Sequence, residues 1–307
     1  MLYNASDDMN AAQHIRALVA CPSCKSDNLR WEAASIECAT CGKTFAVDGE
    51  TPVLLAQDEA DAPRIAEGDR ALSDRLPQRL RAVAVRLRPV ARPLLTHRSH
   101  ATRDLVPTFV AALPAAASVL NVGAGERTYG PNVVNLDIAP GRSIHVVGVA
   151  EELPFRDGVF DAVVFQAVLE HVRDASAALR EIARVLRPGG SVLVEVPFIQ
   201  GYHPTPGDYR RFTVTGLKAE LERHGFEVED SGIAVGPASA MAWVAAEYLA
   251  LLVSGRSARA YRIARILTTW LAWPLKWSDA WLDTHEMAHV IASGVWAKGV
   301  RPHAADR

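Results

Sequence analysis

The chain has 307 residues, which is enough for one large hydrophobic core and a small additional module. Hydrophobic residues make up 49% and charged residues 22% of it, the balance of an ordered globular protein. The formal net charge of -2 is close to neutral, so the chain as a whole lacks the positive charge that would attract nucleic acid. The first ten residues are polar and lack the basic and apolar regions of a secretion signal, so we expect a cytoplasmic protein.

Four cysteines stand in two close pairs, Cys21-Pro-Ser-Cys24 and Cys38-Ala-Thr-Cys41, with thirteen residues between the pairs. Close pairs in a cytoplasmic chain favour metal binding over disulfides, and four thiolates complete a tetrahedral zinc site. Free thiols or a redox pair are the alternatives, although a redox pair needs no second CxxC motif. We therefore predict a zinc ribbon over residues 18–57, with structural zinc held by Cys21, Cys24, Cys38 and Cys41.

The same segment contains an Asp48-Gly49 turn and ends in Pro52-Val53-Leu54-Leu55. With its cysteine pairs, it resembles the zinc-ribbon family of small tRNA-methyltransferase activator proteins. The resemblance implies a structural or docking role. A zinc ion saturated by four thiolates has no open position for catalysis.

Residues 58–103 are rich in arginine, alanine and proline, and nine arginines but a single acid, Asp74, lie between Arg70 and Arg103. The plain interpretation is a solvated linker or linker helix. The alternative is a basic amphipathic helix that binds anionic lipid or RNA phosphate.

From residue 104 to residue 301, strand and helix patterns alternate, which indicates a mostly parallel sheet covered by helices. An apolar stripe from Ala177 to Leu186 predicts one helix, which the turn Arg187-Pro188-Gly189-Gly190 stops. A second helix contains Leu217 and Leu221 and ends at Gly225. The predicted strands are residues 118–122, 133–137, 145–149, 161–165, 191–196 and a final strand over 289–300.

A glycine turn, Asn121-Val-Gly-Ala-Gly-Glu126, follows the first predicted strand, and Asp137 ends the second. Glycines at such a turn let the backbone approach a ligand at the carboxyl edge of the sheet, where a carboxylate can accept the hydroxyls of a ribose. Further motifs follow in a fixed order. They are Leu153-Pro-Phe155, Phe160–Phe165, Val168-Leu-Glu-His-Val172, Arg187-Pro-Gly-Gly190 and Val192–Pro197.

This order resembles class I S-adenosylmethionine-dependent methyltransferases of the methyltransferase type 11 family. The resemblance implies a Rossmann-like α/β fold with a seven-stranded sheet, one strand antiparallel, and helices on both faces. It also implies S-adenosylmethionine as cofactor. The residues that it assigns to cofactor binding are Asn121, Gly123, Gly125, Asp137, Ala150, Glu151, Leu153 and Gln166. Asn121 and Val149 stand where the family carries acids, and Arg127 where a third glycine is common.

The segment after the fifth predicted strand is dense in polar side chains and should meet the substrate. His203 is the candidate proton acceptor, and Asp208 either orients it or acts alone. The predicted substrate-binding residues are Tyr202, Tyr209, Arg210 and Arg211, of which an arginine would hold an anionic group. The alternative is structural: Asp208 pairs with Arg211 to brace the loop, and Thr213 caps the next helix.

An apolar helical insertion is predicted at about 236–285, and Glu247 is the only ionised residue between Ile233 and Val253. The plain interpretation is a helical cover for the active site or a homodimer interface. The alternative is a surface that rests on the inner face of the membrane or accepts a lipid-linked substrate.

The leading hypothesis is methyl transfer from S-adenosylmethionine to oxygen of a small-molecule, glycan or lipid-linked acceptor. The first alternative is an RNA methyltransferase that grips phosphates with the ribbon and the arginine-rich stretch. Nucleic acid is the less favoured partner, because acidic residues of the ribbon offset its lysines and arginine. The second alternative is a degenerate methyltransferase-like scaffold, motivated by Asn121 and Val149.

Overall fold

The computed structural model describes residues 13–55, 95–96, 104–203 and 206–303. The arginine- and proline-rich segment predicted as a linker over 58–103 therefore lies outside the described residues, apart from Leu95 and Thr96.

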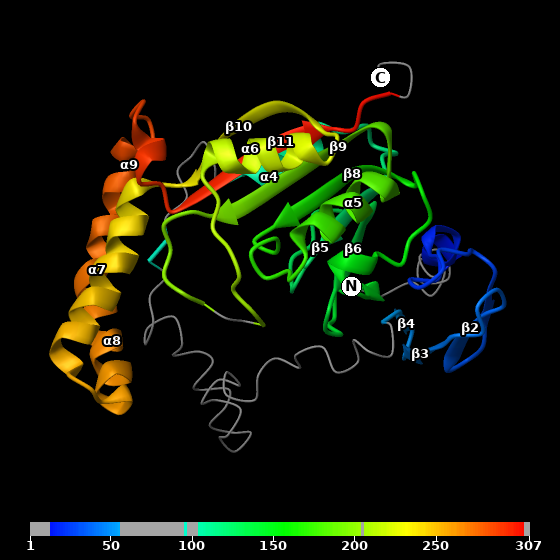
Figure 1. The fold of residues 1–307 in the computed structure, drawn as a ribbon, viewed down its shortest axis with the longest axis horizontal. Coiled ribbons are helices and arrows are strands. Elements are labelled where there is room, and N and C mark those ends of the chain that lie inside the picture. Colours follow the sequence, from blue (N-terminus) through cyan, green and yellow to red (C-terminus); the bar gives the residue numbers. More distant parts are fainter. Residues whose placement is uncertain (1–12, 56–94, 97–103, 204–205, 304–307) are drawn as a thin grey trace, which may run out of the picture.

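The described strands form one continuous sheet in the order β1-β2-β3-β4-β7-β6-β5-β8-β9-β11-β10 (Figure 1). Its larger part consists of β5 (Val119–Val122), β6 (Val133–Asp137), β7 (Val146–Val147), β8 (Phe160–Gln166), β9 (Leu186–Pro197), β10 (Glu227–Val235) and β11 (Gly294–Val300). Strand β11 runs antiparallel to both β9 and β10, whereas β5 pairs in parallel with β6 and β8. The predicted α/β sheet with one antiparallel strand is confirmed in this part of the molecule.

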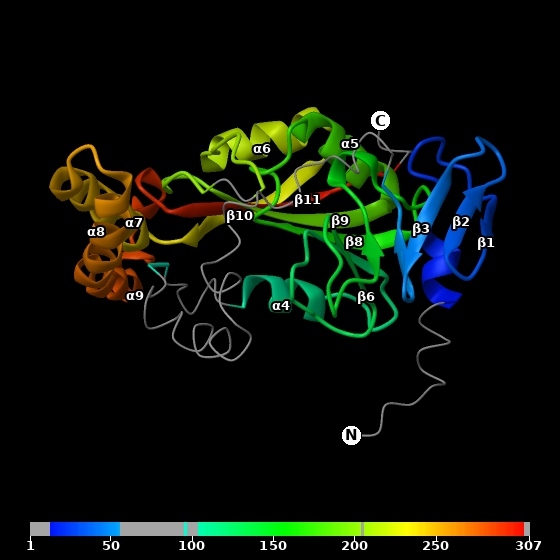
Figure 2. The same ribbon diagram turned by 90° about the horizontal axis from the view of Figure 1, so that it is seen from below.

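The central strands are buried on both faces, which is why their sequences are almost uniformly apolar. Val119, Ala162 and Val164 belong to a core under α4 (Leu105–Ala111), which lies on one face. Leu120 and Phe165 point to the other face, where α5 (Ala175–Val185) and α6 (Val214–Arg223) pack. Figure 2 shows α4 on one side of the sheet and α5 and α6 on the other, as predicted.

Helix α5 begins at Asp174, whose side chain accepts a hydrogen bond from the backbone N–H of Ala177 at 2.9 Å. It ends at Val185, but the following Arg187–Gly190 segment, predicted as a turn, is part of β9. The reason is a pair of backbone hydrogen bonds that joins this segment to Arg301: Gly189 N–H donates to the Arg301 carbonyl at 2.7 Å, and Arg301 N–H donates to the Gly190 carbonyl at 2.8 Å.

The final strand is shorter than predicted, because it begins at Gly294 and not at His289. Residues Ala288–Val290 form a short 3-10 helix, η5, and the side chains of Val290 and Ile291 remain exposed. The apolar residues in this segment resemble the pattern of a strand, but the segment belongs to the last helical turn before β11.

The cysteine-bearing segment folds into four antiparallel strands: β1 (Leu29–Trp31), β2 (Ser35–Cys38), β3 (Thr44–Asp48) and β4 (Thr51–Val53). Strand β4 then pairs in parallel with β7 at Val53 and Val147, so the ribbon extends the larger sheet. Leu18 and Leu54 join the same buried cluster as Phe155 and Phe160. The ribbon and the larger part therefore share one hydrophobic core.

An ion-pair cluster fastens the first cysteine loop to α5. Lys25 Nζ lies 2.7 Å from Glu181 Oε2, and Arg184 donates to the same carboxylate at 2.7 and 2.9 Å. Arg184 also donates to Asp157 at 2.7 Å and to the carbonyl oxygen of Leu153 at 3.0 Å. Glu181 thus links the ribbon to α5 and to the loop before β8.

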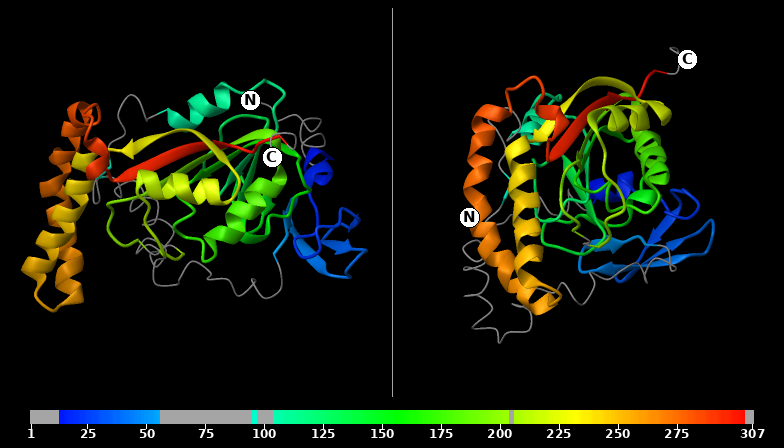
Figure 3. Two further views of the ribbon diagram at one scale, coloured as in Figure 1. Left: turned by 45° about the horizontal axis from the view of Figure 1, so that its top comes forward. Right: turned by 60° about the vertical axis from the view of Figure 1, so that its left-hand side comes forward.

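The chain between β10 and β11 leaves the sheet as a helical hairpin of α7 (Pro237–Ser254) and α8 (Ala258–Ala272), followed by η4 (Trp273–Ser278) and α9 (Asp279–Leu282). The fully buried Asp279 anchors it, because its carboxylate accepts from the N–H groups of Ala238 at 2.6 Å and Ser239 at 2.8 Å. The hairpin projects from the end of the molecule opposite the ribbon (Figures 1 and 3).

Among the described residues, α7 alone has the length and composition of a membrane span, and 44% of it is buried in the protein.

Replacing Glu181 by Gln should lower the free energy of unfolding at neutral pH by about 1–3 kcal/mol, because two partly buried cations lose their carboxylate. Burial alone would raise the pKa of Glu181, but the hydrogen bonds from Arg184 and Lys25 outweigh it and lower the pKa below its ordinary 4.5. The stabilisation is therefore present above pH 4.5 and is lost as the pH falls through the lowered pKa.

Urea unfolding at neutral and acid pH checks this expectation. The control is Glu229→Gln, which breaks the more exposed pair with Lys298 and should cost less than about 1 kcal/mol. An equal cost for the two variants, or a Glu181 effect that does not shrink in acid, would contradict the role given to this cluster.

Candidate functional site

The turns that follow β5, β6, β8 and β9 meet at the carboxyl edge of the sheet, the edge at which open α/β sheets bind ligands. The turn after β5 depends on two glycines in the left-handed region, Gly123 with φ 68° and Gly125 with φ 56°. A Cβ on Gly123 would lie only 2.2 Å from Val168 Cγ2. Glycine at this position therefore lets the turns after β5 and β8 approach each other closely.

Asp137 connects the turn after β6 to the glycine turn. Its carboxylate accepts the N–H of Gly125 at 2.9 Å and the N–H of Ala139 at 3.1 Å. The side chain is only partly buried, and each carboxylate oxygen has a further lone pair with which it can accept another hydrogen bond. This position suits a carboxylate that accepts hydroxyl groups from a ligand.

Asn121 lies beneath the glycine turn and is 3% exposed. Its amide donates to Asn135 Oδ1 at 3.1 Å, and the Asn135 amide donates to the carbonyl oxygens of Arg127 and Ser143 at 3.2 and 2.9 Å. Asn121, predicted to bind cofactor, thus supports the turn from below through neutral amide groups.

Three further residues predicted to bind the cofactor follow β7. Ala150 and Glu151 begin η3 (Ala150–Glu152) beside the site, and Glu151 accepts the Arg173 N–H at 3.2 Å. Leu153, in contrast, is fully buried in the core that the ribbon shares. The local sequence pattern did not indicate that the ribbon would contribute to this core.

Gln166, the last residue of β8, takes part in a polar network that sequence reasoning did not predict. Its carbonyl oxygen accepts from Arg127 and from Tyr129, the latter at 3.1 Å, and its amide donates to Glu195 at 2.5 Å. Glu195 is a buried acid within Val192–Pro197, the part of β9 whose other residues are all apolar, and that anomaly was a usable signal. Arg127, which replaces the usual third glycine, thus reaches across to β8.

The residue after Gln166 is Ala167, which has φ 55°, a left-handed conformation unusual for alanine. The chain turns there and brings Glu170 and His171 to the site. Glu170 is 1% exposed, and burial raises its pKa to about 7. Burial also lowers the pKa of His171. The rings of His171 and His203 meet edge to face, with their centroids 5.1 Å apart.

The loop after β9 is braced as the structural alternative predicts. Asp208 pairs with Arg211 through both oxygens and accepts the His203 N–H at 2.9 Å. Burial would raise the pKa of Asp208, but these contacts outweigh it and lower the pKa to about 2. Such a carboxylate is a weak proton acceptor, so Asp208 orients the loop. Thr213 caps α6 by accepting the Gly216 N–H at 3.0 Å.

The remaining predicted substrate-binding residues have different surroundings. Arg210 donates to the carbonyl oxygens of Val172 and Arg173 at 2.8 and 2.9 Å. The Tyr209 hydroxyl accepts from Arg173 at 3.1 Å. Tyr202 is 75% exposed. Within the predicted cluster, Asp208 contacts both His203 and Arg211, and Arg211 also donates to the Arg210 carbonyl at 2.9 Å.

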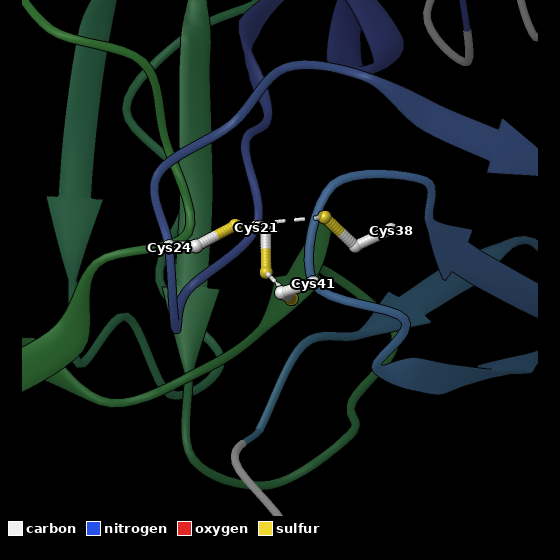
Figure 4. Close-up of side chains that lie close together, drawn as sticks. All are labelled: Cys21, Cys24, Cys38 and Cys41. Atoms are coloured by element: carbon white, nitrogen blue, oxygen red, sulfur yellow. Dashed lines mark hydrogen bonds between the residues drawn. The ribbon is translucent and has the colours of Figure 1, made fainter.

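The four cysteine sulfur atoms point toward one another from two loops (Figure 4). The Sγ atoms of Cys21 and Cys41 are 3.7 Å apart, those of Cys24 and Cys38 are 3.6 Å apart, and all four lie within 4.8 Å of one another. Four sulfur atoms bound tetrahedrally at about 2.3 Å from one zinc ion would be about 3.8 Å apart. The donor set and its spacing therefore fit zinc.

The central part of the chain matches a known protein family. Residues 120–194 match the family model described as "Methyltransferase domain", which confirms the resemblance predicted from the motifs of this segment. The match spans β5 to β9 and so includes the glycine turn, Asp137 and Gln166.

Relatives of known name share a short segment with the chain. The demethylmenaquinone methyltransferase of Mycolicibacterium vanbaalenii is 59% identical over 49 residues, which are 16% of this chain and 22% of that protein. Its Mycobacterium tuberculosis counterpart is 57% identical over 49 residues, 16% of this chain and 21% of that protein. The chain thus spans less than a quarter of the length of these relatives.

Among solved structures, a putative sarcosine dimethylglycine methyltransferase from Galdieria sulphuraria is 14% identical, with a TM-score of 0.45. The superposition covers 72% of this chain and 98% of that one.

Proposed function

We propose that the protein is an S-adenosylmethionine-dependent methyltransferase that acts on an oxygen of a small or lipid-linked acceptor. The observation that supports this most directly is the turn that Gly123 and Gly125 form with Asp137, within the segment that matches the methyltransferase domain. It offers close backbone approach and a carboxylate at the carboxyl edge of a parallel sheet.

S-adenosylmethionine would supply an activated methyl group. The backbone at Gly123 and Gly125 leaves room for its amino-acid part, and Asp137 would accept its ribose hydroxyls. The backbone of Ala150 and Glu151 flanks the adenine position, whereas Leu153 supports it from the core. Gln166 and its partner Arg127 form the wall at the methionine end.

Methyl transfer to oxygen requires an acceptor for the hydroxyl proton. His203 suits this role, because its ring is partly exposed and its Nε2 lies 4.0 Å from the buried Glu170 carboxylate. Asp208 accepts the backbone N–H of His203 and so holds this residue in place. Alignment of donor and acceptor supplies much of the remaining rate enhancement.

The hairpin supports a lipid-linked acceptor. Around the turn between α7 and α8 is a surface, here called the tip patch, that combines exposed apolar side chains with exposed cations. Its members are Leu251, Leu252, Val253, Arg256, Arg259 and Arg262. Apolar side chains beside arginines suit the interface of an anionic membrane. Trp243 of α7 contacts the His203 ring, with centroids 5.9 Å apart, so the hairpin that bears this patch also borders the site.

The four-cysteine site completes the proposal. We infer that Cys21, Cys24, Cys38 and Cys41 bind one structural zinc ion, which stabilises the ribbon and with it the edge of the sheet beyond β7.

Calorimetric titration of the full chain with S-adenosylmethionine and S-adenosylhomocysteine should show micromolar binding. Asp137→Ala should weaken it roughly 10- to 100-fold, because the hydrogen bonds to a charged acceptor are lost. Asp230→Ala, at an exposed aspartate remote from the site, is the control. A folded chain that binds neither ligand would support the scaffold alternative. Once binding is established, incubation of the protein with methyl-labelled S-adenosylmethionine and candidate hydroxyl compounds would identify the methylated atom.

Protein purified without chelator should contain one zinc ion bound by the ribbon cysteines. Cys41→Ser should lose it and unfold at a lower temperature, because three thiolates bind zinc more weakly than four and the ribbon shares the domain core. Elemental analysis together with thermal unfolding measures both effects. Unchanged metal content in Cys41→Ser would overturn the assignment.

The tip patch should bind vesicles that contain anionic lipid, and less so at high salt. Leu252→Glu combined with Val253→Glu should reduce partitioning at least about tenfold, because two apolar side chains no longer enter the interface. Met287→Glu, an exposed apolar position at the hairpin base, is the control. Co-sedimentation measures the partitioning, and equal binding of all three proteins would exclude the tip patch as the contact.

A further inference from the structure

A second group of potential metal ligands lies beside the loop after β9, apart from the cysteine site. Glu170 and His171 follow β8, and His203 follows β9. The Nε2 atoms of His171 and His203 lie 3.7 and 4.0 Å from Glu170 Oε1. One ligand atom from each residue falls within 4.8 Å of the other two.

The hydrogen bonds of the two rings decide which nitrogen faces the carboxylate. His171 Nδ1 contacts the carbonyl oxygen of Gly207, and His203 Nδ1 lies 3.0 Å from that of Gly201. A carbonyl oxygen can only accept, so each Nδ1 carries the proton and each neutral ring has its lone pair on Nε2. Arg211 Nη2 is also 3.4 Å from His203 Nδ1, but it already donates to Asp208 at 2.7 Å and to Gly201 at 3.2 Å.

Three electron-pair donors therefore converge without a cation between them. Glu170 is 1% exposed, and its Oε2 accepts no hydrogen bond from the part of the chain that the structure describes. Separations of 3.7 and 4.0 Å are too long for one proton to bridge the carboxylate and either ring. A buried acceptor without a partner costs free energy, which a bound ion would offset.

We propose that Glu170, His171 and His203 bind a divalent transition-metal ion such as Zn²⁺. Two imidazoles and one carboxylate are a donor set that such ions favour. Tetrahedral bonds of about 2.0–2.2 Å place ligand atoms about 3.4 Å apart, so Glu170 Oε1 and each ring nitrogen must approach each other by less than about 1 Å. The two Nδ1–H groups that donate to backbone carbonyls are the outer contacts that orient ligating histidines.

Three protein ligands leave a coordination position open. In that position the ion would bind the hydroxyl oxygen of the acceptor and promote loss of its proton to solvent, a task that ligated His203 no longer performs. This consequence rests on the proposed function, whereas binding of the ion does not. Arg211 acts electrostatically on Glu170 and would oppose the ion, but its charge is paired with Asp208.

The test is calorimetric titration of the full chain with Zn²⁺, after the ribbon metal has been measured and loosely held metal removed with a weak chelator. One equivalent beyond the ribbon is expected. Glu170→Gln and His203→Gln should each weaken that binding more than about tenfold. His289→Gln, an exposed histidine whose Nδ1 contacts the Glu286 carbonyl, is the matched control and should bind as the natural chain does.

Thermal unfolding without added metal shows whether each variant is folded, and Glu170→Gln should be, since it replaces a buried carboxyl by a neutral amide of the same shape. No equivalent beyond the ribbon, or an equivalent that a folded Glu170→Gln retains, would overturn the proposal. Binding of S-adenosylmethionine measured on the same samples separates the two hypotheses. A chain that binds the cofactor but no second ion refutes this inference alone.

Discussion

The parallel pairing of β5 with β6 and β8 determines where each polar group of the candidate site lies. Asn121 pairs with Asn135 on one side and with Val164 on the other, so the three strands end side by side. The turns that follow them must then meet. Glycine at position 123 makes this close approach possible, because a Cβ there would collide with the side chain of Val168. Asp137 and the Glu170–His171 segment reach the same edge because of this one register.

The ribbon is also held by strand pairing within this sheet. Strand β7 has only two residues and would otherwise form a short exposed sheet edge, which β4 covers. The contacts around Glu181 and the shared core add side-chain interactions to this backbone pairing. The ribbon therefore meets the larger part of the sheet through strand pairing, packing and the contact of Lys25 with Glu181.

Local sequence patterns predicted the features that depend on local chemistry. The glycine turn, the apolar strands and the Thr213 cap each follow from residue type and spacing, and so does the convergence of the four cysteines. Strand β9 includes the predicted turn at Gly189 because its partner, Arg301, is distant in sequence. The final strand begins later than predicted because Ala288–Val290 form a local 3-10 helix.

Local patterns did not indicate the surroundings of single side chains where a distant segment supplies the partner. Leu153 is buried because the ribbon packs over it, and Arg210 is occupied because the carbonyl groups of Val172 and Arg173 lie within its reach. The grouping of Glu170 with His203 joins residues from two different turns, so no spacing within either motif revealed it. The hydrophobic pattern indicated the hairpin, but only its three-dimensional arrangement brings Trp243 against the site.

The core that the ribbon and the larger part of the sheet share determines whether the two segments could exist as separate chains. Each segment completes a surface that the other leaves unfinished, since β4 lies on β7 and Leu18 and Leu54 lie among the domain's phenylalanines. Were the coding sequence divided between them, each product would expose an open strand edge and an apolar face to the crowded cell. Dividing the chain between the two segments would therefore destabilise both products.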